Sequence, residues 1–441
     1  MKKKNLLLLL LLLLLTSQFG FAQQTKFQKI DSLLTFLHAN NKFMGSIALR
    51  ENNKVVFAKA YGLAEAETNK ALDINTKLKI GSITKIFTAT MIMQLIEEKK
   101  LTLDTKLSKF YPKIVNADKI TIHDLLHHRT GIPDFLNDDP NAGEYIFVFN
   151  KREDLIKRIE GYSSAFAPNS EHKYSNSNYN LLGYIIEDVS KKSFSDNLNT
   201  RIIKKLALKN TSFPEKIDVS KNESFSYMFD GKSWVKIPEW SNSLSYAAGA
   251  MSSTPTDLTE FMSGLFSGKL VSKSSLEQMK IMEDGYGKGL TIAPFYEKKF
   301  YGHTGGIESF RAVVGYNEED KLGVSLLVNG DNYSRNDIMI GVLSLYYGMK
   351  YEFPDLSGFP VSTTILEGYE GSYSSSILPI KIIVKSENGN LTAQATGQSA
   401  FTLTAKSETE FLFDAAMIKM IFSENAFILN QGGMKYEFKK E

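Results

Sequence analysis

The chain of 441 residues contains no cysteine. It therefore has no disulfide bond, no thiol nucleophile and no attachment site for a lipoprotein anchor. An excess of charge of one sign is also lacking, because 52 basic and 49 acidic side chains leave a formal net charge of +3. This charge is not clustered, so no nucleic-acid partner is expected. The fold must rely on a hydrophobic core, for which a chain of this length suffices.

The longest apolar run stands at the N-terminus, where ten leucines (Leu6–Leu15) follow Lys2–Lys4. Basic residues, an apolar run and small residues up to Ala22 together predict a signal peptide over residues 1–22, with Gln23 as the new N-terminus. A transmembrane helix is the alternative, but the run is shorter than the roughly 20 residues that a span needs. We expect a periplasmic or secreted protein without a membrane span after cleavage.

Strand-like segments lie far apart in the sequence. They occur at residues 43–65, 311–316 and 322–328, on either side of a stretch with helical periodicity from about 78 to 208. This order predicts one sheet built from distant strands with a helical subdomain inserted. We therefore expect one composite domain over residues 23–349.

The composition changes after Met349. Residues 350–364 contain two prolines and little helical periodicity, which predicts a linker. Residues 365–441 read as short alternating strands, and Asn388-Gly389 is a hairpin signal because both residues tolerate a positive φ. We expect a small β-barrel or sandwich there. It contains no histidine, so we assign it no chemistry, and its partner is unknown.

The segment KIGSITKIFTATM places Lys85 in an otherwise apolar helix. A helix that is apolar on nearly every face is buried. A buried ammonium costs several kcal/mol unless it is paired or loses its proton. Lys85 therefore has a close partner or acts as a base, and both possibilities point to Ser82, one turn earlier.

Ser82 is expected at the start of this helix, where the first amides are unpaired and the helix dipole is positive. Lys85 follows at i+3 on the same face. A serine hydroxyl becomes a good nucleophile when a neighbour removes its proton, and a desolvated lysine can do so. Ser-x-x-Lys alone is a common pattern, so further motifs must support this interpretation.

Two further motifs follow in order, namely Tyr-Ser-Asn at 174–176 and Gly-His-Thr-Gly-Gly at 302–306. Together with GSITK they resemble the three-motif signature of serine β-lactamases and penicillin-binding proteins. The chain is most similar to the class C β-lactamase group, which includes D-alanyl-D-alanine carboxypeptidases, D-aminopeptidases and esterases. The resemblance covers about residues 28–345. It implies an α+β β-lactamase/transpeptidase-like fold: an antiparallel sheet flanked by helices plus an all-helical lobe.

The resemblance implies three catalytic residues. Ser82 would attack a carbonyl and become acylated, and Lys85 would be its base or proton relay. Tyr174 would serve as general base and then as acid to the leaving group, with a pKa lowered by the neighbouring lysine.

It also implies a set of substrate-binding residues. Asn176 would hold the acyl side chain and Lys85, while His303 and Thr304 would hydrogen-bond Tyr174 or a substrate carboxylate. Gly305 and Gly306 would let the strand approach the substrate, and the amides of Ser82 and Gly306 would hold the oxyanion.

The residue type at 303 bears on the substrate. Where the β-lactamases of this group carry lysine, this chain has His303, which is mostly neutral near pH 7. We therefore expect an exported serine hydrolase that acts on D-amino-acid peptides or esters. A β-lactamase and a non-catalytic penicillin-binding or sensing module are the alternatives.

Simpler interpretations exist for several of these segments. Residues 174–176 could merely start a helix, since Ser and Asn are good caps, and Gly305-Gly306 could be a plain turn. His123 and His127 are spaced as a metal pair would be, but no Glu-containing zinc signature surrounds them. We therefore predict no metal and no cofactor.

Overall fold

The computed structural model describes residues 25–230, 232–356, 358–387, 389–398, 400–413, 418–431 and 434–441. The predicted signal peptide, residues 1–22, lies outside this range. The chain forms two compact units, one of residues 41–332 and one that joins residues up to Asn40 with Tyr333–Glu441. Within the described residues, no helix has both the length and the apolar composition needed to cross a membrane.

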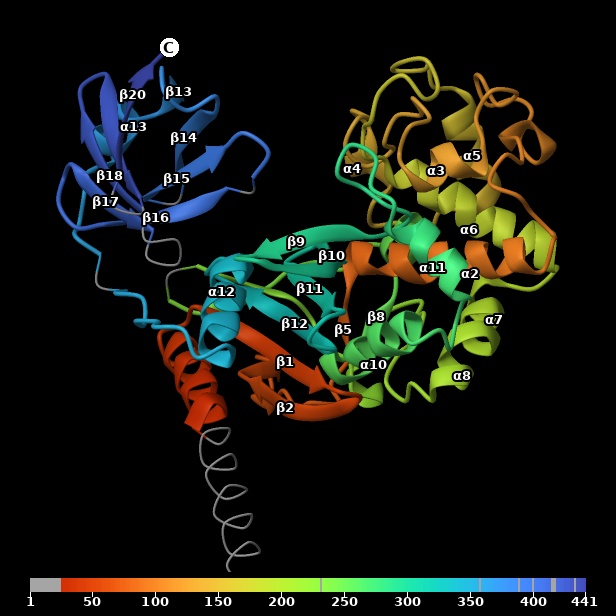
Figure 1. Cartoon of the computed structure of the whole chain (residues 1–441), viewed down its shortest axis with the longest axis horizontal. Helices are drawn as coiled ribbons and strands as arrows, with labels where there is room; N and C mark the ends of the chain where they lie inside the picture. The colour runs from red at the N-terminus through yellow and green to blue at the C-terminus, as the bar shows by residue number, and fades with distance from the viewer. Residues whose placement is uncertain are drawn as a thin grey trace, which may run out of the picture. The chain divides into compact units, whose positions relative to one another are not determined.

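The first unit is built on a sheet whose central strands are antiparallel, in the order β2-β1-β12-β11-β10-β9, with β6 parallel to β12 and β7 beyond β6 (Figure 1). Two short pairs, β3-β4 and β5-β8, lie apart from it. The strands are β1 (Phe43–Glu51), β2 (Lys54–Tyr61), β3 (Leu63–Glu65), β4 (Lys70–Ala71), β5 (Leu78–Lys79), β6 (Tyr227–Phe229), β7 (Trp234–Lys236), β8 (Ser252–Ser253), β9 (Thr291–Phe295), β10 (Lys298–Ile307), β11 (Phe310–Asn317) and β12 (Leu322–Asp331).

Pairing of β1 with β12 joins residues 43–51 to residues 322–331. The prediction of one sheet from distant strands is therefore confirmed. Both strands are almost wholly buried, as expected for strands at the centre of a sheet.

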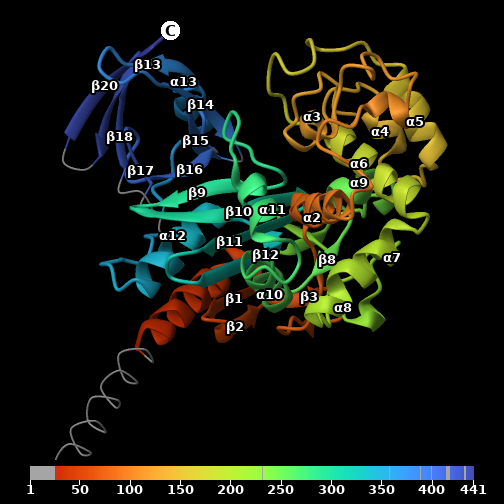
Figure 2. The same ribbon diagram turned by 45° about the vertical axis from the view of Figure 1, so that its right-hand side comes forward.

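The helices of this unit come mainly from the middle of its sequence, and α10 covers one face of the sheet (Figure 2). They are α2 (Thr84–Glu97), α3 (Ile122–Leu126), α4 (Ala142–Tyr145), α5 (Arg152–Glu160), α6 (Asn176–Ser190), α7 (Phe194–Leu198), α8 (Lys204–Leu206), α9 (Asn242–Gly249), α10 (Pro255–Phe266) and α11 (Lys273–Lys280). Helix α10 begins where the sequence places a cap and a proline, with the Thr254 side chain accepting from the Asp257 amide.

Helix α2 is central to the core of this unit. Every residue from Thr84 to Leu95 is buried, which explains why Lys85 is the only charged side chain in that stretch. It packs against α6 and α9, and the turn before it (Gly81–Ile83) contacts β10. This arrangement brings the three sequence motifs together.

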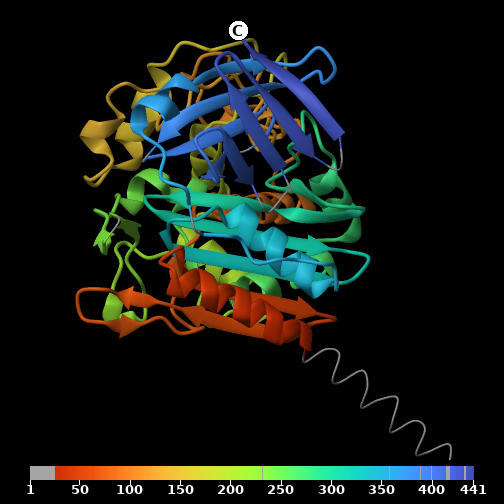
Figure 3. The ribbon, with the colours of Figure 1, turned by 90° about the vertical axis from the view of Figure 1, so that its left-hand side faces the viewer.

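The second unit contains a helical part and a closed barrel. The helix over residues 25–39 and α12 (Arg335–Tyr346) lie side by side (Figure 3), so closely that a Cβ at Gly341 would come within 2.7 Å of the Leu33 side chain. Helix α13 (Thr363–Gly368) precedes the barrel and adds Leu366 to its core.

Eight strands close the barrel in sequence order, with β13 pairing both β14 and β20. They are β13 (Gly371–Ser374), β14 (Lys381–Glu387), β15 (Asn390–Ala395), β16 (Phe401–Ala405), β17 (Glu410–Phe413), β18 (Ile418–Ser423), β19 (Ala426–Gln431) and β20 (Met434–Lys440). The predicted C-terminal β fold is thus a barrel. Its hairpin between β14 and β15 turns through Gly389 at φ +76°, while Asn388 lies outside the described residues. The proposed boundaries at 349 and 364 stay predictions.

Candidate active site

Ser82, Lys85 and Tyr174 form one hydrogen-bonded group. Ser82 lies in the turn that leads into α2, and Lys85 is one turn later on the same helix. The Lys85 Nζ is 3.0 Å from the Ser82 Oγ, and the Tyr174 hydroxyl donates to the same Oγ at 2.8 Å. The serine hydroxyl thus lies between two groups that can exchange protons with it.

Lys85 has two other partners besides Ser82. Its Nζ is 2.8 Å from the Asn176 Oδ1 and 2.8 Å from the Ala248 carbonyl oxygen. Asn176 is the first residue of α6, and Ala248 lies near the end of α9. Two helices therefore supply acceptors to a lysine that is itself 0% exposed.

Burial controls the proton affinities of this group. Desolvation lowers the pKa of Lys85 from 10.5 to about 7, although the negative charge of Asp134 acts in the opposite direction. Desolvation raises the pKa of Tyr174 well above its usual value, and Asp134 adds to the rise while the hydrogen bond with Ser82 opposes it. The expected lowering of the Tyr174 pKa is therefore wrong, because burial outweighs any effect of a lysine that is only partly charged near pH 7.

Asp134 is a residue that the sequence analysis did not select. Its carboxylate is buried and accepts a hydrogen bond from the Asn176 Nδ2 at 2.9 Å. This bond directs the amide oxygen of Asn176 toward Lys85. The acid follows a proline in the segment ITIHDLLHHRTGIPD, and a single sequence carries no further signal for its role.

A cluster of aromatic rings surrounds Tyr174. The ring of His128 lies 4.3 Å from that of Tyr174, and Tyr286 meets Tyr174 edge-on at 6.0 Å. His128 accepts from the Ser175 amide through Nδ1 at 3.1 Å, and burial lowers its pKa well below the usual value. His128 is thus a neutral packing group. Neither His128 nor Tyr286 had a signal in the sequence.

His303 and Thr304 lie on β10. The ring of His303 is 6.4 Å from the ring of Tyr174, and its Nε2 is 3.0 Å from the Tyr286 hydroxyl. Thr304 is exposed. The His303 imidazole was expected to hydrogen-bond Tyr174 or a substrate carboxylate. In the structure its Nε2 pairs with the Tyr286 hydroxyl.

Gly305 and Gly306 bring β10 close to the nucleophile. A Cβ on Gly305 would lie 1.9 Å from the Ile80 carbonyl oxygen and 3.3 Å from the Ser82 amide nitrogen, so only glycine fits. Gly81, at φ +51°, faces Gly306 in the same way, with a Cβ falling 2.7 Å from the Gly306 nitrogen. The backbone around Ser82 and Gly306 is thus in close contact, as an oxyanion hole formed by their amides requires.

A buried ion pair fixes this contact. The Lys79 Nζ lies 2.8 Å from the Glu308 Oε1, and both side chains are almost fully buried. Lys79 lies three residues before Ser82, and Glu308 lies two residues after Gly306. Burial raises the pKa of Glu308, while Lys79 opposes the rise. The pair therefore links β5, which precedes the Ser82 turn, to the residue that follows β10.

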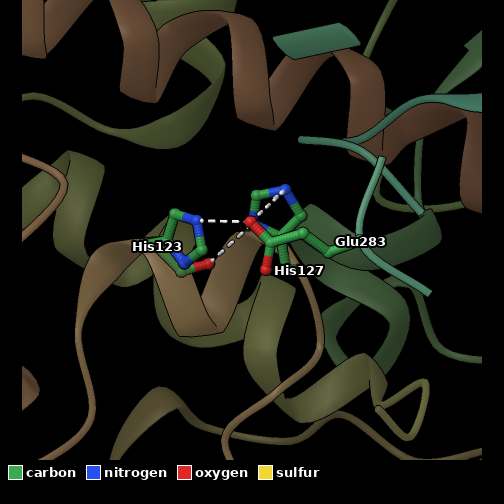
Figure 4. Close-up of side chains that lie close together, drawn as sticks. All are labelled: His123, His127 and Glu283. Atoms are coloured by element: carbon green, nitrogen blue, oxygen red, sulfur yellow. Dashed lines mark hydrogen bonds and ion pairs between the residues drawn. The ribbon is translucent and has the colours of Figure 1, made fainter. Parts of the chain in front are cut away.

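His123 and His127 lie close together, with the Glu283 carboxylate between them (Figure 4). The ligand atoms of the three side chains all lie within 4.8 Å of one another. The sequence spacing suggested the pair, but the carboxylate comes from a loop 156 residues further along the chain than His127.

Comparisons with known proteins give consistent results. The sequence model described as Beta-lactamase matches residues 39–342. A penicillin-binding protein of Bacillus subtilis is 25% identical over 94% of this chain and 99% of its own length. A teichoic acid D-alanine hydrolase of Staphylococcus aureus is 28% identical over 72% of this chain and 79% of its own.

A solved structure with a similar fold is the D-amino acid amidase from Ochrobactrum anthropi SV3, in complex with L-phenylalanine amide. It superposes with a TM-score of 0.66 at 25% identity, over 74% of this chain and 99% of the amidase. The β-lactamase/transpeptidase-like fold predicted from the three motifs is confirmed.

Proposed function

The chain belongs to the beta-lactamase family, and from this premise we propose that it is an exported serine hydrolase that forms an acyl-enzyme on Ser82. Its relatives are hydrolases of the serine β-lactamase superfamily. The observation that carries the proposal is the hydrogen-bonded group of Ser82, Lys85 and Tyr174. A binding module has no need of a buried lysine in contact with a serine hydroxyl.

The proposed proton path begins at Lys85. In its neutral form the amine has two N–H groups for the Asn176 and Ala248 oxygens and a lone pair for the Ser82 proton. Ser82 then attacks the acyl carbon as its proton passes to Lys85. Lys85 is thus the base, in place of Tyr174.

Tyr174 keeps its proton because burial raises its pKa. Its hydroxyl already points to Ser82, so it is suited to donate a proton to the departing alcohol or amine. The proton that Lys85 took from Ser82 then passes to the Tyr174 oxygen. In the acyl-enzyme, Lys85 and Tyr174 are therefore both neutral again. Water then releases the acid by the reverse sequence, while the amides of Ser82 and Gly306 hold the oxyanion in each half.

We propose that the acyl group is that of a D-amino acid, held as an ester or an amide. The relatives named above, a D-alanine hydrolase and a D-amino acid amidase, support this choice. His303 supports it too. Its imidazole hydrogen-bonds the Tyr286 hydroxyl and, unlike a lysine, does not carry the permanent positive charge that a β-lactam carboxylate favours.

Two measurements test the proposal. Intact-mass analysis after treatment with a phosphonate or a fluorescent penicillin should show one adduct, lost in Ser82→Ala. A panel of a chromogenic D-alanine ester, its L enantiomer, a D-alanyl dipeptide and a chromogenic cephalosporin should show fastest turnover of a D substrate. Absence of any adduct would indicate the sensing module, and preferred turnover of the cephalosporin would indicate a β-lactamase.

A further inference from the structure

We propose that His123, His127 and Glu283 form a binding site for one Zn²⁺ ion. The Nε2 atoms of His123 and His127 lie 3.0 Å and 4.0 Å from the same carboxylate oxygen, Glu283 Oε1 (Figure 4). Two ligands at about 2.0–2.1 Å from a tetrahedral zinc are about 3.3 Å apart, so the observed distances lie on either side of that value. Small side-chain rotations would complete the site.

The surroundings of His127 supply a second reason. Its Nδ1 faces the His123 carbonyl oxygen at 3.3 Å, and its Nε2 faces the Ile281 carbonyl oxygen at 3.4 Å. A neutral imidazole has one N–H, so one of its nitrogens must face an oxygen with a lone pair. If Nδ1 carries the proton, the Nε2 lone pair faces the Ile281 carbonyl oxygen and the Glu283 carboxylate, which repel it. A cation bound at Nε2 would remove this repulsion.

His127 is suited to metal binding. Its side chain is fully buried. Imidazole binds a metal in its neutral form. The Nδ1 contact with a backbone carbonyl is the arrangement that usually orients a metal-binding histidine.

The remaining side chains fit the same role. The Asp124 carboxylate lies 3.8 Å from the His123 Nδ1, on the side opposite Glu283. The Arg129 Nε lies 3.9 Å from Oε2 of Glu283. The two imidazoles face the other oxygen, Oε1. Two imidazoles and one carboxylate favour zinc over magnesium or calcium, which prefer oxygen ligands.

The site would hold a loop that reaches the active site. Glu283 and Tyr286 exchange two backbone hydrogen bonds of 3.0 Å, so they move as one turn. Tyr286 in turn contacts His303, and His127 is followed directly by His128, which packs on Tyr174. A zinc ion would thus fix the aromatic wall beside Tyr174. The site itself does not depend on the proposed hydrolase activity.

The test uses the full chain after removal of metals with a chelator. Titration calorimetry with Zn²⁺ should give one equivalent for the wild type, and Mg²⁺ should give no binding. Glu283→Gln keeps an acceptor for His123 but loses the carboxylate, so zinc affinity should fall about 100-fold or more. Asp284→Asn is the matched control, because this neighbouring acid pairs with Arg129 and lies outside the cluster. It should bind zinc as the wild type does.

Thermal melting supplies a readout independent of activity. Zinc at about 100 times its Kd should raise the Tm of wild type and Asp284→Asn by about 2–5 °C and leave Glu283→Gln unchanged. Circular dichroism of the metal-free proteins shows whether Glu283→Gln is folded, and if it is not, His123→Gln at the partly exposed ligand replaces it. Zinc binding of less than one equivalent, or unchanged binding by a folded ligand variant, would overturn the proposal.

Discussion

The side chain of Lys85 is buried with acceptors on three sides, and its charge is costly to keep. Its pKa of about 7 lies below the usual 10.5, so the folded protein holds this proton less tightly than the unfolded chain does. The penalty is fully present below pH 7, where it amounts to about 5 kcal/mol, and it fades as the pH rises toward 10.5.

Replacing Lys85 with methionine should therefore separate stability from activity. The variant should keep or raise the Tm, with a larger gain at pH 6 than at pH 9. Ester turnover should fall by about 10²–10⁴, the usual effect of losing a general base. Lys85→Arg should not restore turnover, because a guanidinium does not give up its proton. Near-wild-type turnover of Lys85→Met would mean that Lys85 is a structural cation only.

The same pKa predicts the pH dependence of the reaction. Only neutral Lys85 can accept the Ser82 proton, so kcat/KM should rise about tenfold per pH unit up to about pH 7 and then level off. A rise that continues without levelling up to pH 9 would assign the base to a group with a higher pKa, such as Tyr174. The measurement is kcat/KM for a D-alanine ester between pH 5 and 9, corrected for spontaneous hydrolysis.

Asp134 offers a way to shift that profile. Its negative charge raises the pKa of Lys85, so Asp134→Asn should lower it and move the acid limb to lower pH by about one unit. Asp138→Asn, in the same loop and paired with Lys173, is the control and should leave the limb in place. A limb that stays fixed in Asp134→Asn would show that another group titrates.

Single-residue chemistry was partly predictable from the sequence. The motifs and the apolar helix were enough to select Ser82, Lys85, Tyr174 and Asn176, which lie together in the structure. The direction of the Tyr174 pKa was not predictable, because it depends on burial by rings from distant segments. Asp134 and Tyr286 were missed because loops bring them to the site and loops carry no periodic signal.

At the scale of elements, the close approach of β10 to the turn before α2 is the feature most open to test. Gly305→Ala would push a methyl into the Ile80 carbonyl, so the protein should lose about 1–3 kcal/mol of stability, and turnover should fall as β10 moves from Ser82. Gly306→Ala is the matched control for stability, because its Cβ would meet nothing closer than 3.8 Å. Equal melting temperatures of the two variants, measured by calorimetry, would refute the close contact.

Elements with a clear period were predictable, and irregular ones were not. The strand-like runs at residues 380–384, 391–395 and 401–405 of the sequence fall on β14, β15 and β16, whose ends differ from them by up to three residues. Strand β13, which closes the barrel, has the sequence GSYS and offers no such alternation. Strand β6 joins β12 through only two residue pairs, a contact set by tertiary packing alone.

At the scale of the whole molecule, the unit of residues 41–332 and the barrel have separate hydrophobic cores. One joins α2, α6 and the sheet, and the other fills the barrel. The residues proposed for catalysis and binding, from Ser82 to Gly306, all belong to the unit of residues 41–332. Export stays a prediction, and sequencing of the secreted protein should find Gln23 at its N-terminus.

The two cores predict two separable unfolding events. Phe438 is fully buried in the barrel and stacks on Phe427 with ring centroids 5.1 Å apart, so Phe438→Ala should cost about 3–5 kcal/mol there. Calorimetry of the full chain should show one transition lowered and the other unmoved, because the mutated core shares no residue with the core around α2. Ester turnover at 25 °C should remain that of the wild type. A single transition that shifts as a whole, together with lost turnover, would show instead that the barrel and the catalytic unit fold as one.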